Sequence, residues 1–434
     1  MRLVKRFGGD FRYVPPWKKW LYWNDQRWEV DQTGEIVRRA KETVKLIYAE
    51  AANASSTADR KALADHAKNS EAASRIGAMI RLASTEPEAP AMPDQLDTNL
   101  SALNVLNGTI DLHTGKLRPH RREDLITKLA PVEFDGTAQC PMFMSFLDKI
   151  TAGDEELQKF LQRAIGYGLT GDTSEQVMFV AYGTGANGKS TLLNVIQDLL
   201  GDYALQTPTD TFVRKRDRSA TNDLARLRGS RFVVATEVNA DGKLDEVLVK
   251  QITGGDKISA RFLYREFFEF QPECKIFLVT NYKPDISGSD EGIWRRIILI
   301  PFEVRIPEGE RDKHLIEKLR KELPGILAWA VEGCLAWQWE GLCPPERVRA
   351  ATSRYREEMD WMSTFLRERC LLRERAITSA ADLFAAFGLW WNNDDGDQPN
   401  QKVFGSRLTA AGLQSGKKSG KSKWTGITLK PKDH

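Results

Sequence analysis

The stretch that decides the fold is Val177-Met-Phe-Val-Ala-Tyr-Gly-Thr-Gly-Ala-Asn-Gly-Lys-Ser-Thr-Leu-Leu-Asn-Val-Ile-Gln-Asp-Leu-Leu200. Its first six residues are apolar and β-prone, which is typical of a buried parallel strand. Residues 183–190 follow at once in the pattern GxxxxGK[ST], and residues 191–200 have a helical pattern. A strand, a glycine-rich loop and a helix in this order form the setting that a phosphate-binding P-loop requires. The stretch therefore predicts an α/β nucleotide-binding core.

The residues of this loop share one predicted task, which is to surround phosphate oxygens. Glycines let backbone N–H groups turn inward, and the positive end of the following helix favours an anion. The lysine adds a charge at the β- and γ-phosphates, and the serine hydroxyl is a suitable Mg²⁺ ligand. We therefore expect ATP and Mg²⁺ as cofactors, with the nucleotide bound by Gly183, Gly185, Ala186, Asn187, Gly188, Lys189, Ser190 and Thr191.

Two further apolar runs end in polar residues. Residues 230–237 end in Glu237, which could polarise a water molecule or hold the metal together with Ser190. A strand-end glutamate that only faces solvent is the alternative. Residues 275–281 end in Asn281, whose amide could hydrogen-bond both the γ-phosphate and the attacking water. Arg295 and Arg296 precede a fourth run, and an arginine there could reach a neighbouring subunit's site. Alternatively, this pair meets only solvent or a local carboxylate.

Residues 258–269 alternate basic and aromatic side chains and predict a β-hairpin. Basic groups between aromatic rings suit tracking of a nucleic-acid backbone with base contact. We expect Lys257, Arg261 and Arg265 to bind DNA. In the alternative interpretation the phenylalanines belong to the core and the arginines bridge subunits.

The front third predicts a scaffold without catalytic carboxylates. Aromatic residues in 1–30 indicate a small β module with a hairpin at 20–30, and their use for base stacking is the alternative. Residues 34–83 are helical in pattern, 86–93 read as a proline-rich linker, and 143–169 as a helix. A turn at 113–115 separates a predicted strand over 103–112 from one over 116–118.

The C-terminal residues are strongly basic. Although the whole chain of 434 residues has a net charge of only +3, residues 401–434 carry eight Lys or Arg against one acidic residue. Helical patterns at 355–372, 379–391 and 400–413 precede a basic turn and a strand, which is the order of a winged helix. A basic tail without a fold is the alternative. The DNA-binding candidates in the turn are Lys417, Lys418, Lys421 and Lys423.

Composition excludes several classes of protein. Hydrophobic residues at 41% and charged residues at 28% indicate a globular protein, and no apolar run has the length of a membrane helix. The N-terminus has no apolar segment of a signal peptide, and the five cysteines form no CxxC pair. We expect a cytoplasmic protein.

Five motifs follow one another along the chain in an order that resembles a known family. They are GTGANGKST (183–191), ATEVN (235–239), KQITGGDKISARFLYREFFEF (250–270), FLVTNYKP (277–284) and GIWRRIILIPF (292–302). This set resembles superfamily 3 helicases, and most of all the helicase half of phage and plasmid primase–helicases, which is related to the poxvirus primase–helicase. Residues 103–129 resemble the domain that precedes the helicase in that branch. The likeness covers about residues 100–305 strongly.

The resemblance implies an AAA+ ring, usually hexameric, that couples ATP hydrolysis to 3′→5′ movement on DNA. Lys189 and Ser190 match the phosphate and Mg²⁺ contacts, Glu237 the Walker B acid and Asn281 the first sensor. Of the two candidate finger arginines, the resemblance favours Arg296. The family usually carries an acidic pair or near-pair at the Walker B position, whereas Thr236 and Asn239 flank Glu237 here. Its channel hairpin matches the hairpin predicted at 258–269.

We therefore expect an α/β chain of four parts: an N-terminal α+β module (1–93), a pre-helicase domain (94–160), an AAA+ ATPase/helicase domain (161–345) and a winged-helix DNA-binding domain (346–434). The expected function is ATP-dependent DNA unwinding by a homo-oligomeric ring for a phage, plasmid or integrated element, in the cytoplasm of a bacterial host. The alternative is an ATP-regulated, origin-binding initiator without processive unwinding. No acidic triad for primer synthesis is visible in residues 1–150, so we expect no primase activity and leave room for a separate primase partner.

Overall fold

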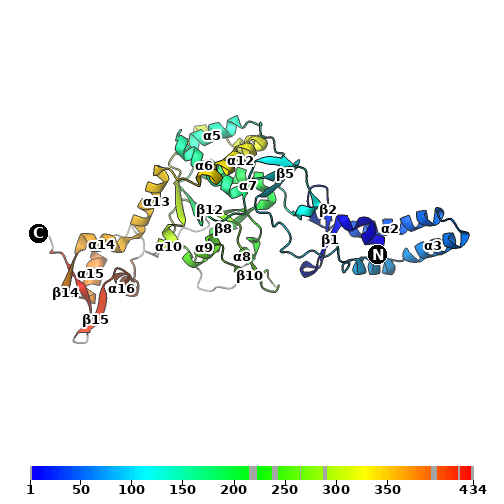
Figure 1. The fold of residues 1–434 in the computed structure, drawn as a ribbon. Helices are drawn as coiled ribbons and strands as arrows, with labels where there is room; N and C mark the ends of the chain where they lie inside the picture. The colour runs from blue at the N-terminus through cyan, green and yellow to red at the C-terminus, as the bar shows by residue number, and fades with distance from the viewer. Residues whose placement is uncertain are drawn as a thin grey trace.

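The computed structural model describes residues 2–214, 222–236, 243–263, 265–286, 291–391, 398–418 and 421–431. Figure 1 shows three parts in a row: an N-terminal arm in blue, a central α/β core, and a C-terminal unit in orange and red. The core positions the candidate site, and the two outer parts project from it on opposite sides.

A five-stranded, wholly parallel sheet forms the centre of the core and confirms the predicted α/β class. Its strands lie in the order β13-β7-β12-β9-β8, so the P-loop strand β7 has a neighbour on each side. Because the carboxyl ends of parallel strands meet at one edge, the residues that follow β7 and β12 lie side by side. The strands are β7 (Met178–Tyr182), β8 (Ala204–Pro208), β9 (Phe232–Thr236), β12 (Lys275–Thr280) and β13 (Ile297–Pro301).

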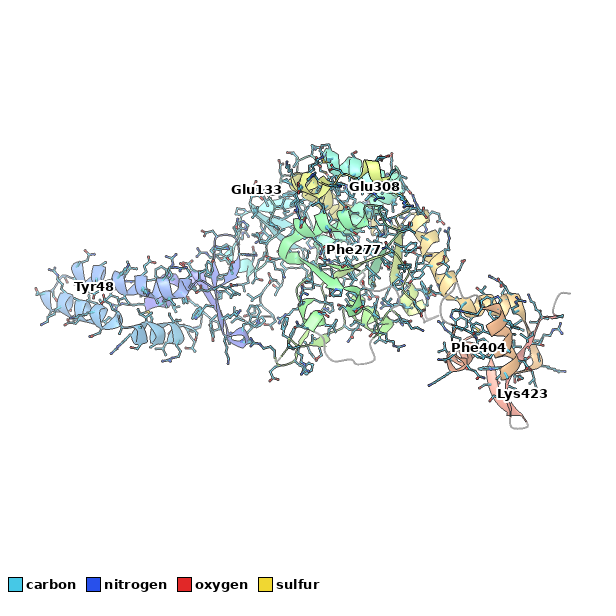
Figure 2. All side chains as sticks on the ribbon, turned by 180° about the vertical axis from the view of Figure 1, so that it is seen from behind. Tyr48, Glu133, Phe277, Glu308, Phe404 and Lys423 are labelled. Atoms are coloured by element: carbon cyan, nitrogen blue, oxygen red, sulfur yellow. The ribbon has the colours of Figure 1, made fainter. Side chains whose placement is uncertain are left out.

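Helices cover both faces of this sheet because its residues are apolar on both sides. Alternate strand residues such as Phe179 and Phe277 pack against one layer, and Val180 and Leu278 against the other. The ring of Phe277 stacks on Phe179 at 4.6 Å and on Phe232 at 4.3 Å, deep in the core (Figure 2). The first layer comprises α5 (Pro141–Thr151), α6 (Glu155–Leu169), α7 (Lys189–Leu200), α11 (Leu315–Arg320) and α12 (Leu323–Glu340). The second comprises α8 (Asn222–Arg226), α9 (Glu246–Thr253), α10 (Glu291–Trp294) and α13 (Glu346–Met359).

The predicted helix over residues 143–169 is wrong in one respect, because it is two helices. Ala152 and Gly153 adopt positive φ angles of 56° and 73°, which end α5. Asp154 then caps α6 through its side chain, which accepts a hydrogen bond from Leu157 N. The predicted boundary at 160/161 falls inside α6, so this helix joins the pre-helicase segment to the core.

The N-terminal arm contains the predicted hairpin and helices. Strands β1 (Phe11–Val14), β2 (Lys19–Trp23) and β3 (Trp28–Val30) form an antiparallel sheet. Trp28 and Phe11 are buried, as expected for rings used as a core, whereas Trp17 is exposed. The helices are α1 (Arg2–Phe7), α2 (Glu35–Ala52), α3 (Thr57–Ser70) and α4 (Ala73–Ala83). Tyr48 lies far out along the arm (Figure 2).

The proline-rich stretch 86–93 does not act as a free linker. Tyr13 N donates to Ala89 O at 2.6 Å, and Ala91 N donates to Tyr13 O at 2.8 Å, so the stretch runs beside β1. Ala89 and Ala91 are buried there. The predicted linker is therefore packed against the arm over part of its length.

A second small sheet follows, with strands β4 (Ala102–Val105), β5 (Gly108–Asp111) and β6 (Lys116–Arg118). The turn at 113–115 is confirmed, but the single strand expected over 103–112 is two strands. The chain turns at Leu106-Asn107 before Gly108, and Asn-Gly is a strong hairpin signal that was available in the sequence.

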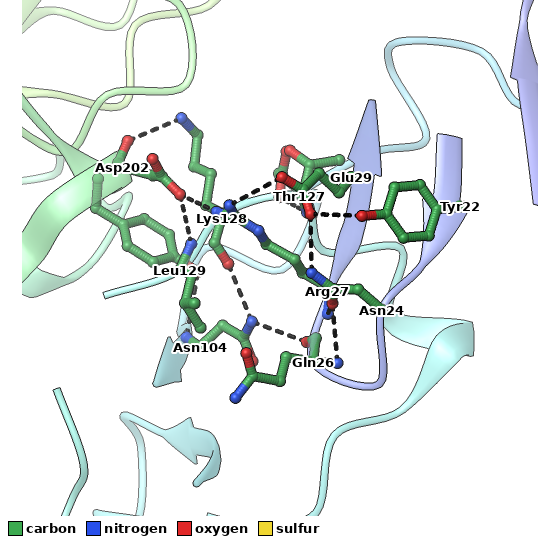
Figure 3. Close-up of polar contacts among 12 residues, drawn as sticks. Tyr22, Asn24, Gln26, Arg27, Glu29, Asn104, Thr127, Lys128, Leu129 and Asp202 are labelled. Atoms are coloured by element: carbon green, nitrogen blue, oxygen red, sulfur yellow. Dashed lines mark hydrogen bonds and ion pairs between the residues drawn. The ribbon is translucent and has the colours of Figure 1, made fainter. Parts of the chain in front are cut away.

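Polar contacts join the arm and this small sheet to the core (Figure 3). Arg27, in the turn between β2 and β3, pairs with Asp202, which follows the P-loop helix α7. Asn104 Nδ2 donates to Gln26 O and to Lys128 O at 3.0 Å each. The Asp202 carboxylate also accepts from Leu129 N at 3.1 Å. The residue that follows α7 by two positions is thus tied to two separate chain segments, at Arg27 and at Leu129.

The C-terminal unit contains α14 (Trp361–Arg369), β14 (Cys370–Ser379), α15 (Ala380–Trp390), α16 (Gln401–Ala410), β15 (Gln414–Lys418) and β16 (Lys421–Leu429). Its sheet has the order β14-β16-β15. Ser379 caps α15 as expected, Asn400 caps α16, and the unfolded-tail alternative is wrong for residues 401–431 within the described part.

The predicted helix over 355–372 is corrected to two helices and the start of a strand. Helix α13 ends at Met359, Asp360 caps α14, and β14 begins at Cys370. The predicted domain start at residue 346 is also too early, because α13 packs on the core: Tyr355 is fully buried against Trp294.

Within the described ranges, none of the helices combines the length and apolar character that crossing a bilayer requires.

Candidate functional site

The P-loop follows β7, and its glycines occupy positions that no larger residue would fit. A Cβ at Gly183 would lie 2.2 Å from Phe302 O, and one at Gly188 would lie 2.3 Å from Ile150 Cγ2. Gly185 has a φ of +100° with open space around it, so its backbone can face a ligand. The loop is therefore shaped as a phosphate cradle by close packing behind it and open space in front.

The rest of the P-loop is anchored to the segment that follows the edge strand β13. Asn187 is buried, and its Nδ2 donates to Phe302 O at 3.1 Å. Ala186 O accepts from Ile306 N at 2.8 Å. Ser190 is exposed at the start of α7, where its hydroxyl can reach a ligand, and Thr191 is half-buried.

Lys189 and Asn281 meet at the carboxyl edge of the sheet, as the order of the strands predicts. Lys189 Nζ donates to Gly183 O at 2.5 Å and to Asn281 Oδ1 at 3.2 Å. Lys189 is only 3% exposed, whereas Asn281 is exposed just beyond the end of β12. The contact joins the P-loop to the predicted sensor.

Glu237 lies outside the described residues, as do Asn239 and the rest of 237–242. The last described residue before it is Thr236, at the carboxyl end of β9, where it pairs with Val279 of β12. The role of Glu237 as base or metal ligand stays a prediction. In the described part of the chain, no group of three or more His, Cys, Asp or Glu side chains is arranged to hold a metal ion.

The two candidate finger arginines have different surroundings. Arg296 is 8% exposed, and its guanidinium donates to Thr253 Oγ1 at 3.1 Å, Gly292 O at 2.7 Å and Gln176 Oε1 at 3.4 Å. Arg295 is exposed and lines a groove of about 470 Å³ between β13, α10 and α13. Geometry therefore opposes the preference for Arg296 and favours Arg295, because only an accessible guanidinium can reach a neighbouring subunit.

The predicted basic hairpin is present and its tip is exposed. Strands β10 (Ile258–Ala260) and β11 (Phe268–Phe270) pair antiparallel, and Arg261 and Arg265 lie in the exposed loop between them. Arg261 lies 4.7 Å over the ring of Phe267, which is 56% exposed. Lys257 is exposed at the base of the hairpin, about 13 Å of extended chain from Arg261. The structure therefore does not bring Lys257 together with the two arginines.

The basic turn of the C-terminal unit is a β-hairpin. Lys418 pairs with Lys421 at its end and Lys417 with Ser422, and the side chains of Lys417, Lys418 and Lys421 lie outside the described residues. Lys423 is half-buried on β16, close to the end of the hairpin (Figure 2).

Two buried cations at the opposite, amino edge of the sheet were missed. Arg231, 3% exposed, donates to Ala102 O, Leu169 O and Asn99 O at 2.9–3.1 Å. Lys275 Nζ donates to the carbonyl oxygens of Thr170, Asp172 and Glu273. Burial, with the nearby Arg231 charge, lowers the pKa of Lys275 to about 7. Each cation starts a strand, but nothing in the local pattern indicates which distant carbonyls it meets.

Lys283 was also missed, although the motif FLVTNYKP contains it two residues after Asn281. Its Nζ lies 5.2 Å over the ring of Tyr182, the last residue before the P-loop, and 5.8 Å over that of Tyr355. It also pairs with Glu358.

Two family models match separate parts of the chain. A family described as D5 N terminal like matches residues 1–152, and a family of unknown function (DUF5906) matches residues 181–296. A protein of Acanthamoeba polyphaga mimivirus named as a candidate helicase is 30% identical over 335 residues, which cover 71% of this chain and 35% of that protein. An African swine fever virus protein named as a candidate primase is 25% identical over 334 residues, 69% of this chain and 34% of its own. The chain is therefore similar to the D5 N terminal like family and to viral proteins named as helicases or primases.

The chain spans about a third of the length of the curated relatives named here, or less. A candidate helicase of Frog virus 3, for example, is 29% identical over 258 residues, 55% of this chain and 26% of that protein. Because the relatives named here are viral, the expected phage or plasmid context and bacterial host stay predictions. Among solved structures, the apo NrS-1 C terminal region (305–718) is similar with a TM-score of 0.50 and 11% identity, covering 98% of each chain. That likeness concerns the fold alone.

Proposed function

We propose that the chain is an ATP-dependent DNA helicase that acts in replication as a homo-oligomeric ring, with six subunits and 3′→5′ movement. The observation that carries the proposal is the contact of Lys189 with Asn281, 3.2 Å long, between a complete P-loop and the end of the adjacent strand. Lys189 and Asn281 must lie this close if both are to contact the same γ-phosphate. Only then can the position of Asn281 depend on whether ATP or ADP is bound.

Within this proposal, the residues of the P-loop bind the phosphates of ATP. The exposed Ser190 hydroxyl, together with Glu237, is the expected contact for Mg²⁺. When bound, the metal neutralises phosphate charge. The open space at Gly185, the buried Lys189 and the close packing behind Gly183 and Gly188 fit a triphosphate.

The proposed ring follows from the role of Arg295 as an arginine finger. Arg295 is exposed on a groove away from its own P-loop residues, so its natural target is the γ-phosphate bound by a neighbouring copy. One arginine supplied across each interface makes every ATP site depend on two chains, which requires a closed ring for full activity.

Two surfaces suit DNA. The β10–β11 tip exposes Arg261 and Arg265 beside Phe262, Leu263 and Phe267, which are 42%, 67% and 56% exposed. Exposed rings and guanidinium groups bind single-stranded nucleic acid by stacking and charge. In the C-terminal unit, the element order α14-β14-α15-α16-β15-β16 supports a winged helix, with α16 in the position to enter a duplex groove and the basic hairpin on phosphates.

The C-terminal unit also favours a second candidate function, an origin-binding initiator in which ATP switches assembly. In that case, substitutions of Arg261 and Arg265 in the β10–β11 hairpin would leave ATP turnover unaffected. The C-terminal unit alone would determine the affinity for DNA. We propose no primer synthesis by this chain; labelled primers made by the purified protein would overturn that part of the proposal. A separate primase is a possible partner.

Ring assembly and function are tested together by electron microscopy with a non-hydrolysable ATP analogue and forked DNA, followed by strand displacement on the same fork. The proposal expects closed rings around one strand and ATP-dependent displacement. ATP hydrolysis without displacement would reduce the chain to a DNA-stimulated ATPase.

A further inference from the structure

Lys283 lies where three parts of the candidate ATP site meet. It follows Asn281 by two residues, so it belongs to the loop that carries the sensor. Its Nζ lies over Tyr182, which ends the P-loop strand, and over Tyr355 of α13, at 5.2 and 5.8 Å. A cation at this distance from two ring faces is attracted by both, and its position between them fixes the spacing of the elements that carry the rings.

Helix α13 holds the same loop by two further bonds. The Glu358 carboxylate forms an ion pair with the ammonium of Lys283. The Tyr355 hydroxyl donates a hydrogen bond to the carbonyl oxygen of Pro284, the residue next to Lys283. The Tyr355 ring is fully buried and meets Trp294 edge-on at 5.2 Å. The side chain of Lys283 is itself only 17% exposed, so its contacts with the two rings are shielded from water, whereas the Glu358 side chain is 42% exposed.

Helix α13 also reaches α10, the short helix that ends just before Arg295. Arg356, next to Tyr355, pairs with Glu291 at 2.6 Å. Glu291 is the first residue of α10, and Arg295 follows the last residue of that helix. The C-terminal half of α13 therefore contacts the sensor loop and the helix that precedes Arg295 at the same time. A single residue, Asp360, separates α13 from the C-terminal unit.

We propose that Lys283, held by Tyr182, Tyr355 and Glu358, is a positioning residue that sets Asn281 against Lys189 for ATP hydrolysis. Lys283 does not touch the nucleotide in this account; it fixes the loop on which the sensor lies. This inference rests on the proposed ATPase function and names a residue for it that the family motifs do not assign.

The test measures steady-state ATP hydrolysis and equilibrium binding of a fluorescent ATP analogue by the full chain. Lys283→Met keeps the aliphatic length and removes the charge, so kcat should fall about tenfold while KM and analogue affinity change less than about twofold. Lys283→Arg keeps a cation between the rings and should recover at least about half of kcat. Lys159→Met is the matched control, because Lys159 is exposed on α6 and pairs with Glu156 one turn away.

Glu358→Gln provides a milder second variant in case Lys283→Met fails to fold. Gln keeps an acceptor at this exposed rim but removes the charge that holds Lys283, and kcat should fall about threefold. The inference is overturned if both Lys283→Met and Glu358→Gln keep wild-type kcat, or if Lys283→Arg is no better than Lys283→Met. Absence of ATP hydrolysis by the wild-type chain would instead contradict the proposed function.

Discussion

Lys189 Nζ lies 3.2 Å from Asn281 Oδ1, a hydrogen bond between residues 92 positions apart in the chain. The sheet makes this contact possible, because β7 and β12 are parallel neighbours and Tyr182 pairs with Thr280 at their carboxyl ends. In the proposed mechanism a bound γ-phosphate competes for both side chains. Loss and recovery of this bond would then accompany each cycle of hydrolysis.

Asn281→Ala should separate ATP binding from ATP turnover. The amide is expected to orient the γ-phosphate and the water, whereas the P-loop supplies most of the affinity, so kcat should fall about 10- to 100-fold with KM changed less than about threefold. Initial rates of phosphate release over a range of ATP concentrations measure both constants. Asn53→Ala, at an exposed residue in the arm, is the control and should leave both unchanged.

Arg295→Ala should abolish hydrolysis without lowering thermal stability, because its side chain is exposed. Loss of the buried Arg296 side chain should instead destabilise the fold by about 2–4 kcal/mol, because three polar groups lose their donor. Phosphate release and thermal unfolding distinguish the two variants. If Arg295→Ala lowered the stability as much as loss of Arg296 does, its lost hydrolysis could be explained by unfolding, and the prediction would be contradicted.

Mixing two inactive variants tests whether the finger acts across the interface. Lys189→Ala keeps Arg295, and Arg295→Ala keeps the P-loop, so random mixed rings should contain about a quarter of active sites. Phosphate release from a 1:1 mixture should therefore exceed that of either variant alone. No gain on mixing, with rings confirmed by mass measurement, would place the finger in its own subunit's site.

The β10–β11 tip should contribute charge to DNA binding. Arg261→Ala with Arg265→Ala should make the salt dependence of single-strand affinity less steep by about 1.4 in log–log slope, because about 0.7 of a counterion is released per contacted phosphate. Fluorescence anisotropy at several salt concentrations gives this slope. Lys257→Ala, at the base of the hairpin, should change it less, and an unchanged slope in the double variant would exclude the tip from the DNA interface.

Stability should rise with pH because of Lys275. Its folded pKa of about 7 lies below the ordinary value of 10.5, so between these values the unfolded chain binds more protons than the folded one. The destabilising effect is complete below pH 7 and is relieved toward pH 10.5, by up to about 1.4 kcal/mol per pH unit. Denaturant unfolding at pH 7 to 9.5 measures the slope, and Lys275→Met should lose this part of it. Equal slopes in both proteins would contradict the assigned pKa.

The parts of this molecule that could be predicted from sequence are those encoded locally. The P-loop strand, loop and helix at 177–200 were predictable because the residues that form the strand, the turn and the phosphate contacts follow one another in a single recognisable pattern. The N-cap residue Ser379 indicated the start of α15 for the same reason. The burial of Arg296 and the contacts of Lys283 with Tyr355 depend on which distant elements pack together, and a single sequence does not encode those partners in a readable local pattern. The helix α13 was assigned to the wrong part of the chain because its amphipathic pattern does not show which surface it covers.

The central claim, ATP-driven DNA unwinding, is tested most directly by strand displacement from duplexes with a single 3′ or 5′ tail. The account predicts that wild-type protein with ATP and Mg²⁺ displaces the strand from the 3′-tailed duplex only, and that Lys189→Ala displaces neither. Hydrolysis of ATP with both duplexes left intact would contradict it.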